Sequence, residues 1–355
     1  MRKLRVGLIG SGWIAMNAHL PVLSVRDDVS VVGICDVDLS KASEAATRFG
    51  ISFATDKVVE LMEKKLDLAI VTTPTNTHIS LIEYFLKENV YVLCEKPLGM
   101  SSMEIDKLLA LPNAYTHLSV GYVNRFRRDV IQFLDEINNV HSCSVVWRRF
   151  NGIPRPGSWI TTKEISGGGV LMDIGSHMLD LAFECCNMGC YSPSGTLSSS
   201  GAIQEKGATW FHSSETKGEV NTEDTAIVKL QDERNRHIEL HVSWNDSTCD
   251  ADYTQIICHS KERTYELRTL FGYSEQRRWP FPEIIIYENE KGIVKREQPY
   301  GEKYPSPLEA FINMYDDLIT KIQNNDVLSC QIDTGRRVAN VIDYIYTENM
   351  KNYEK

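Results

Sequence analysis

Long apolar runs, a positive charge balance and an ordered set of cysteines are all missing from this sequence. No segment approaches the about 18 consecutive apolar residues of a transmembrane helix, so we expect no membrane partner. The net charge of −10 argues against nucleic acid and anionic membrane surfaces as general partners. The nine cysteines are odd in number and have no framework spacing, which favours a reducing, cytoplasmic location.

Internal repeats and low-complexity linkers are likewise missing, so we expect domains that pack directly against each other. Hydrophobic residues make up 42% of the chain and charged residues 24%, which is the balance of a soluble globular protein. A length of 355 residues predicts about two domains.

The first third of the chain alternates short, nearly continuous apolar strands with helices. The expected strands are 4–9, 29–35, 68–72, 91–94 and 116–120, and the expected helices lie near 13–25, 39–49, 56–64, 77–88 and 101–110. This alternation predicts a doubly wound parallel sheet that is covered by helices on both faces.

The pattern changes after about residue 125. The expected elements are a helix at 127–139, a strand at 142–150, a helix at 170–186, strands at 195–204, 207–213, 224–231, 236–244, 253–259, 263–268 and 284–288, and helices at 307–324 and 334–350. Successive alternating strands with short turns predict a large, mostly antiparallel, open sheet with one face exposed or used for association. The fold class is therefore α/β, with a parallel-sheet domain at 1–124 and an α+β domain at 125–355.

A glycine-rich turn follows the first predicted strand. Gly10 and Gly12 belong to a G-x-G-x-x-A pattern, in which the first glycine permits a tight turn and the second lets backbone approach a pyrophosphate. The backbone N–H groups at Trp13 and Ile14, where the next helix starts, then face the phosphates. Asp36 ends the second strand, where a carboxylate accepts hydrogen bonds from both ribose hydroxyls of NAD and repels the extra phosphate of NADP. We therefore expect a dinucleotide, NAD rather than NADP; the alternative for Asp36 is a solvated strand-end carboxylate.

Two further strand ends carry polar residues. The strand 68–72 runs into Thr73, Pro74, Asn76 and His78, where Thr75 or Asn76 is the expected helix cap. The strand 91–94 runs into Glu95, Lys96 and Pro97. Because ligands bind open parallel sheets beyond the carboxyl ends of the strands, these residues are expected to line the same crevice as the glycine turn. A capped helix start and a solvated lysine are the simpler alternatives.

The segment GGGVLMDIGSHMLD places ionisable residues in a helix that otherwise looks like core. At helical spacing Asp173, His177 and Asp180 share one face. Without further context, a buried Asp/His pair is more often a satisfied polar network than a catalytic unit. The preceding Gly167–Gly169 is expected to bring backbone close to cofactor or substrate and to set the entry of the helix, although it could simply terminate a loop.

These three motifs together, G-x-G-x-x-A, Glu-Lys-Pro and GGG-x-x-x-D-x-G-x-H-x-x-D, resemble the Gfo/Idh/MocA family of oxidoreductases over nearly the whole chain. The resemblance implies a Rossmann domain followed by a domain built on a large, mostly antiparallel sheet. It also implies NAD(P)-dependent hydride transfer to or from a sugar, cyclitol or related derivative, and assembly as a homodimer or homotetramer through the C-terminal sheet.

Residue roles also follow from the resemblance. Lys96, Asp173 and His177 match the family's catalytic group, with His177 as acid/base, and the Lys96–Pro97 bond resembles a peptide that is frequently cis. Asn124 lies in a segment that resembles the family's crossing between domains near the nicotinamide. Independently of the resemblance, Asp180 could orient the imidazole or simply hydrogen-bond within the core, and we expect the structural role.

Substrate contacts are less well marked by the sequence. Arg125, Arg149 and Trp159 are candidates beside Asp173 and His177, with surface charge or loop anchoring as the alternative. No metal is expected: the cluster Cys185, Cys186 and Cys190 has poor ligand spacing and is better explained by helix packing. An NAD-binding regulator or structural protein of the same fold remains the alternative function.

Overall fold

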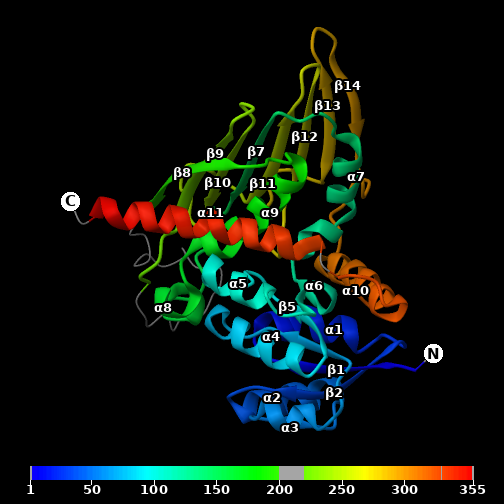
Figure 1. The fold of residues 1–355 in the computed structure, drawn as a ribbon. Helices are drawn as coiled ribbons and strands as arrows, with labels where there is room; N and C mark the ends of the chain where they lie inside the picture. Colours follow the sequence, from blue (N-terminus) through cyan, green and yellow to red (C-terminus); the bar gives the residue numbers. More distant parts are fainter. Residues whose placement is uncertain (1, 200–219, 329, 354–355) are drawn as a thin grey trace. The chain divides into compact units, whose positions relative to one another are not determined.

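The computed structural model describes residues 2–199, 220–328 and 330–353, which form two compact units (Figure 1). The first unit comprises Met1–Val123 and Pro307–Arg336, and the second comprises Asn124–Ser306 and Arg337–Lys355. In the described part of the chain, no helix is both long and apolar enough to span a bilayer.

The first unit contains a six-stranded parallel sheet with the strand order β3-β2-β1-β4-β5-β6. Its strands are β1 (Leu4–Ile9), β2 (Val29–Cys35), β3 (Ala54–Thr55), β4 (Leu68–Val71), β5 (Tyr91–Cys94) and β6 (Leu118–Val120). Its helical elements are η1 (Ala15–His19), α1 (Leu20–Leu23), α2 (Leu39–Phe49), α3 (Val58–Met62), η2 (Thr75–Thr77), α4 (His78–Lys87), α5 (Ser102–Leu109), α6 (Ala114–His117) and α10 (Pro307–Asn324). The order reverses direction at β1, as in a doubly wound dinucleotide-binding sheet, so the predicted fold class of this unit is confirmed.

The second unit contains an eight-stranded sheet with the order β14-β13-β12-β11-β7-β10-β9-β8. Its strands are β7 (Ser142–Arg148), β8 (Tyr191–Ser198), β9 (Thr225–Asp232), β10 (His237–Ser243), β11 (Tyr253–His259), β12 (Arg263–Thr269), β13 (Glu283–Glu288) and β14 (Gly292–Glu297). Its helical elements are η3 (Val123–Phe126), α7 (Arg128–Glu136), η4 (Trp159–Thr161), α8 (Lys163–Ser166), η5 (Leu171–Gly175) and α9 (Ser176–Cys185), and α11 (Cys330–Tyr353) spans both units. Among the described strands of this sheet, only β7 and β10 pair in parallel, so the prediction of a mostly antiparallel sheet is confirmed.

The core of the second unit lies between this sheet and α9, which packs over β7 and β10 (Figure 1). Alternate residues of β7 are buried, among them Val145 and Trp147, and the residues between them are half-buried. The period of two gives the sheet one apolar face, against which the apolar residues of α9 pack.

Several elements differ from the expectations. The strands β3 and β14 were not predicted because β3 has two residues and β14 is largely exposed. The strand expected at 195–204 begins earlier, at Tyr191, and the strand expected at 207–213 lies outside the described residues. The helices expected at 13–25 and 170–186 each contain a π-helical turn, η1 and η5, which widens the backbone locally.

The C-terminal helices also differ in their assignment. We expected 125–355 in one domain, whereas Pro307–Arg336 belongs to the first unit. The reason is visible in side-chain packing: the Phe311 ring meets the buried His19 ring edge-on at 5.2 Å, and Asp316 pairs with Arg26 at 2.6 Å. The apolar face of α10 thus completes the first unit.

Candidate functional site

The glycine turn after β1 is held by the neighbouring strand. Gly10 adopts a φ of +92°, and a Cβ atom there would lie 2.8 Å from the carbonyl oxygen of Thr72. The Thr72 hydroxyl donates to the carbonyl of Gly10 at 2.8 Å. At Gly12, by contrast, a Cβ would meet no atom within 4 Å. The fold itself therefore requires a glycine at position 10 and leaves open space at position 12, as a pyrophosphate would need.

Asp36 ties the end of β2 to this turn. Its Oδ2 accepts hydrogen bonds from the Ser11 backbone N–H at 2.7 Å and from the Ser11 hydroxyl at 2.8 Å, and Oδ1 accepts from the Asp38 N–H at 2.9 Å. The solvated-carboxylate alternative is therefore incomplete, because Asp36 also orders the glycine turn. Trp13 is 39% exposed and Ile14 is half-buried.

The turn after β4 is organised by histidine and threonine rather than by the expected cap. Neither Thr75 nor Asn76 caps α4: Thr75 is buried inside η2, and α4 begins at His78. The ring of His78 is buried, with Nε2 at 2.9 Å from the Thr73 carbonyl and Nδ1 at 2.9 Å from the Pro97 carbonyl. Burial lowers the pKa of His78, so a neutral ring can donate its single proton to only one of these carbonyls. His78 thus links the turns after β4 and β5.

Glu95 anchors the turn that carries Lys96. Its Oε1 lies 3.0 Å from Nε2 of His19, whose Nδ1 lies 2.6 Å from the hydroxyl of Tyr315. Its Oε2 accepts a hydrogen bond from the Lys96 backbone N–H at 3.2 Å. The Lys96–Pro97 peptide is cis, as the family resemblance led us to expect. The half-buried Lys96 therefore leaves β5 from a backbone that is fixed on both sides.

In the second unit, Asp173 and His177 lie among aromatic side chains. The indole Nε1 of the fully buried Trp244 donates to Asp173 Oδ2 at 3.0 Å. The Trp147 ring is tilted against the His177 ring with centroids 6.2 Å apart, and His177 is 8% exposed. Asp173 belongs to the π-helical turn η5, and such turns occur frequently at functional sites. Asp173 and His177 are thus contacted by tryptophans of two neighbouring strand segments: Trp147 lies on β7, and Trp244 directly follows β10.

Arg149 belongs to the same neighbourhood. Its guanidinium lies 5.2 Å from the centroid of the Trp147 ring. Burial lowers the pKa of Arg149, while the negative charges of Asp173 and Asp252 act in the opposite direction. A partly exposed cation beside Asp173 is compatible with the substrate role that we predicted, and that role stays a prediction.

Arg125 binds Asp180, the last of the three ionisable residues (Asp173, His177 and Asp180, the ionisable stripe) on one face of the helical segment. Its guanidinium donates to both carboxylate oxygens of Asp180, at 2.8 and 2.6 Å, and pairs with Glu184 at 3.0 Å. Burial raises the pKa of Asp180 to about 6 in spite of these contacts. This bidentate pair supports the structural role expected for Asp180 and occupies the guanidinium that we had considered for substrate. Asn124, the residue before Arg125, is buried, and Trp159 in η4 is 40% exposed.

The glycines before the helix approach the chain's own residues. A Cβ at Gly168 would lie 1.9 Å from the Tyr346 hydroxyl, and a Cβ at Gly169 would lie 2.0 Å from the Glu223 carbonyl oxygen. We expected the close approach to be toward cofactor or substrate; the structure places protein atoms there instead. The second expectation, that these glycines set the helix entry, agrees with the geometry.

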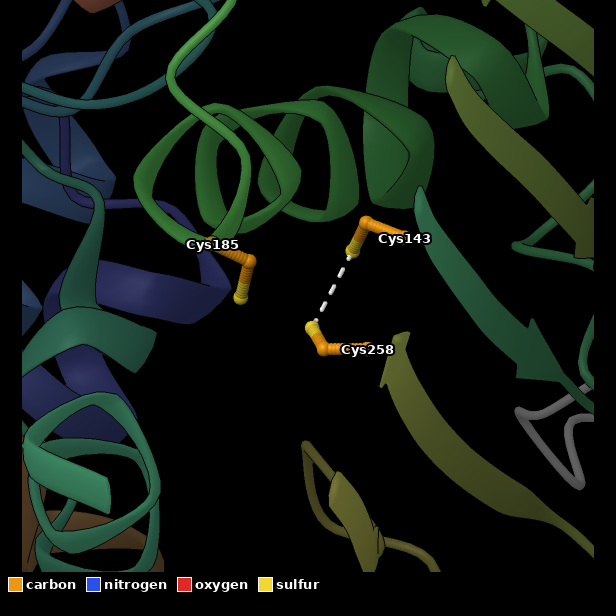
Figure 2. Close-up of side chains that lie close together, drawn as sticks. All are labelled: Cys143, Cys185 and Cys258. Atoms are coloured by element: carbon orange, nitrogen blue, oxygen red, sulfur yellow. Dashed lines mark hydrogen bonds between the residues drawn. The ribbon is translucent and has the colours of Figure 1, made fainter. Parts of the chain in front are cut away.

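Cys185 meets cysteines that are remote in sequence rather than Cys186 and Cys190. Cys143 and Cys258 stand opposite each other on β7 and β11, with their sulfurs 3.6 Å apart, and all three sulfurs lie within 4.8 Å of one another (Figure 2). Hydrogen bonding to Cys185 and burial raise the pKa of Cys143 well above its usual range, and hydrogen bonding to Cys143 and burial do the same for Cys258. Protonated thiols in an apolar core pack as small hydrophobic groups.

Several residues of this site carried no signal in the sequence. Trp244, Glu223 and Tyr346 are far apart along the chain, and no motif spacing connects them to Asp173. Trp147 was likewise not among the site residues expected from the sequence. Arg148, next to Arg149, pairs with Asp246 at 2.9 Å and lies 2.7 Å from Nδ1 of His241.

Comparisons with known proteins support this assembly of motifs. The profile described as "Oxidoreductase family, NAD-binding Rossmann fold" matches residues 4–122, and that described as "GFO/IDH/MocA C-terminal domain" matches residues 134–261. The chain belongs to the GFO/IDH/MocA family of oxidoreductases. The family expectation drawn from the sequence is therefore confirmed.

Individual relatives of this GFO/IDH/MocA protein cover almost its entire length. A putative UDP-kanosamine synthase oxidoreductase subunit of Amycolatopsis mediterranei is 28% identical, over 97% of this chain and 95% of its own. The D-glucoside 3-dehydrogenase of Escherichia coli is 25% identical, over 97% and 94%. Among solved structures, levoglucosan dehydrogenase in complex with NADH and levoglucosan gives a TM-score of 0.79 at 20% identity, covering 99% of this chain and 98% of its own. A 3-ketoreductase of Actinomadura kijaniata in complex with NADP and TDP-benzene gives 0.75 at 18%, covering 98% of both chains.

Proposed function

We propose that this protein transfers a hydride between NAD and a hydroxyl or carbonyl carbon of a sugar, cyclitol or sugar derivative. The observation that carries the proposal is the pair Asp173 and His177, four residues apart on one helical segment and contacted by Trp244 and Trp147 respectively. The named activities of the full-length relatives, which act on glucosides or belong to a sugar-nucleotide synthase, support a sugar-like substrate.

The proposed roles follow from the chemistry of an alcohol oxidation. A bound nicotinamide supplies the hydride acceptor, and the protein must position the carbon and take the hydroxyl proton. His177 is assigned the role of accepting that proton, because an imidazole is the side chain best suited to acid/base chemistry near neutral pH. Asp173 orients substrate hydroxyls or the imidazole, and Lys96 stabilises the negative charge that develops on the reacting oxygen.

The residues of the glycine turn fit a dinucleotide. Gly12 offers space where a pyrophosphate needs close approach, and the adjacent helix start offers backbone N–H groups. Asp36 keeps a carboxylate at the end of β2, which favours the unphosphorylated ribose of NAD over NADP. The remaining predicted contacts, at Thr73, Pro74 and Asn76, lie in the turn that follows β4.

Steady-state kinetics with NAD, NADP and a panel of free sugars, cyclitols and nucleotide-linked sugars tests the proposal. We expect turnover with at least one of them, a preference for NAD, and a loss of kcat of about 10²–10⁴-fold in His177→Gln with unchanged NADH binding. The control is His237→Gln, which changes an exposed histidine of β10. Tight NADH binding without turnover on the whole panel refutes the proposal and favours a regulator of the same fold. Full activity of His177→Gln refutes the acid/base role of His177.

We also propose a cytoplasmic homodimer or homotetramer that associates through the C-terminal sheet. The described cysteines outside position 330 are free thiols, as a reducing compartment maintains them. Ile293 and Val294 on β14 expose apolar side chains that association would cover. Light scattering should give two or four subunits, and a monomer at micromolar concentration would refute the assembly.

A further inference from the structure

A single acidic residue, Glu223, accepts the backbone hydrogen bonds at the start of the helical segment that carries Asp173 and His177. The carboxylate of Glu223 accepts hydrogen bonds from the Gly169 N–H, at 3.0 Å to each oxygen, and from the Leu171 N–H at 3.1 Å. The Val170 N–H between them donates to the backbone carbonyl of Glu223 at 3.1 Å. Three successive amide groups at the start of a helix, which have no acceptor within the helix, are thus satisfied by one residue.

A tyrosine holds this carboxylate in place. The hydroxyl of Tyr346, on α11, donates to Glu223 Oε1 at 2.7 Å. The same hydroxyl occupies the space where a side chain at position 168 would be, and the Glu223 carbonyl occupies the corresponding space at position 169. Gly168 and Gly169 therefore pack directly against Tyr346 and Glu223. A larger side chain at either glycine would displace the tyrosine hydroxyl or the Glu223 carbonyl.

A second connection runs from the same place to the Asp173 side chain. The carbonyl of Asp224, the residue after Glu223, accepts a hydrogen bond from the Trp244 backbone N–H at 2.8 Å. The indole of Trp244 then donates to Asp173 Oδ2. The dipeptide Glu223-Asp224 thus fixes both the start of the helical segment and the tryptophan that contacts its first ionisable residue.

We propose that Glu223, held by Tyr346, is a positioning residue that sets the orientation of Asp173 and His177 for the reaction. The inference rests on the proposed function. A carboxylate suits this place because the N-terminus of a helix carries partial positive charge. Its oxygens are taken up by the Gly169, Leu171 and Tyr346 donors, so Glu223 acts through the helix and does not itself touch substrate.

Three variants separate positioning from simple stability. Glu223→Gln keeps the size but removes the charge, Tyr346→Phe removes only the hydroxyl that holds the carboxylate, and Glu239→Gln is the matched control on an exposed glutamate of β10. At a temperature where all are folded, we expect kcat to fall about 10–100-fold in Glu223→Gln and less in Tyr346→Phe. KM should change no more than about twofold, the fluorescence titration with NADH should be unchanged, and Glu239→Gln should match the wild type.

A residue that contributed only stability would lower the melting temperature and leave kcat per folded molecule intact, which would overturn the inference. Two readouts do not depend on turnover. Hydrogen exchange at amides 169–171 should accelerate about 10–100-fold in Glu223→Gln relative to the control. The pKa of His177, followed by NMR titration, should move in Glu223→Gln and not in Glu239→Gln.

These two readouts separate the failure of the inference from the failure of the proposed function. If the wild type lacks turnover while both readouts change as expected, the proposed function fails and Glu223 still orients the helical segment. Unchanged exchange at 169–171 or an unmoved His177 pKa overturns the inference even if the wild type is an active dehydrogenase.

Discussion

The two glycines of the nucleotide turn should respond to the same substitution in opposite ways. At Gly10 the positive φ costs an alanine about 1–2 kcal/mol, and its Cβ would press on backbone atoms of Thr72 at 2.8 and 2.9 Å, which no rotamer change relieves. We expect Gly10→Ala to lower the free energy of unfolding by about 2–4 kcal/mol, which corresponds to about 4–16 °C in melting temperature. At Gly12 a Cβ meets nothing in the protein, so Gly12→Ala should keep the wild-type melting temperature.

Cofactor binding should show the reverse order. If the open space at Gly12 serves a pyrophosphate, the Cβ of Gly12→Ala stands between backbone and phosphate, and NADH should bind at least about tenfold more weakly. Thermal unfolding without cofactor and fluorescence titration with NADH, on both variants, give the two numbers independently. A Gly12→Ala protein that binds NADH like the wild type, or that unfolds as early as Gly10→Ala, would refute the reasoning.

Three further predictions address the second unit. Trp244→Phe removes the indole donor of Asp173 and some core volume, so the free energy of unfolding should fall by about 2–4 kcal/mol and kcat about tenfold; an unchanged kcat would show that the hydrogen bond is dispensable. Because burial raises the pKa of Asp180 from 3.8 to about 6, the native protein keeps a proton that the unfolded chain has already lost between these pH values. The stabilisation from this group is complete below about pH 3 and is lost as the pH rises through about 6. The unfolding free energy of wild type minus Asp180→Asn should therefore fall by about 2 kcal/mol from about pH 4 to about pH 7 in denaturant titrations. Finally, the free energy of unfolding of Cys143→Ser, from denaturant titration, should be lower than that of Cys143→Ala by about 1 kcal/mol or more, because a hydroxyl needs a hydrogen-bond partner in the apolar core and a thiol does not. Equal losses of stability in the two variants would indicate a ligand role for the sulfur.

The local parts of the fold could be read from the sequence because local physics determines them. The strand 4–9 is specified by its apolar residues, and the turn that follows it is specified by the backbone freedom of Gly10 and Gly12. The strand and the turn are adjacent in the sequence. The Asp173 and His177 pair is likewise local, since four residues separate its members. The motif of the helix therefore predicts this pair from the sequence alone.

The support of that site could not be read in the same way. Glu223 and Tyr346 contact Gly168 and Gly169 across long stretches of chain, and a single sequence carries no signal for such pairs. The assignment of α10 to the first unit had the same origin, because its Phe311 packs on His19 nearly 300 residues earlier. Cys185 illustrates the limit most directly: its neighbours in sequence are cysteines, but its neighbours in space are Cys143 and Cys258.

The ionisable stripe in an otherwise apolar helical segment can now be divided by what each member contacts. Asp180 receives two hydrogen bonds from a permanent cation, Arg125, so its carboxylate is held within the structure. Asp173 accepts a hydrogen bond from the neutral indole of Trp244 and lies near the Arg149 cation. His177 lies beside the Trp147 ring, which limits the orientations open to the imidazole. A helix that needed these residues only for stability would be served by apolar side chains, because burying charge is costly. The cost is explained if Asp180 anchors the helix while Asp173 and His177, oriented from neighbouring strands, remain able to exchange a proton with a substrate.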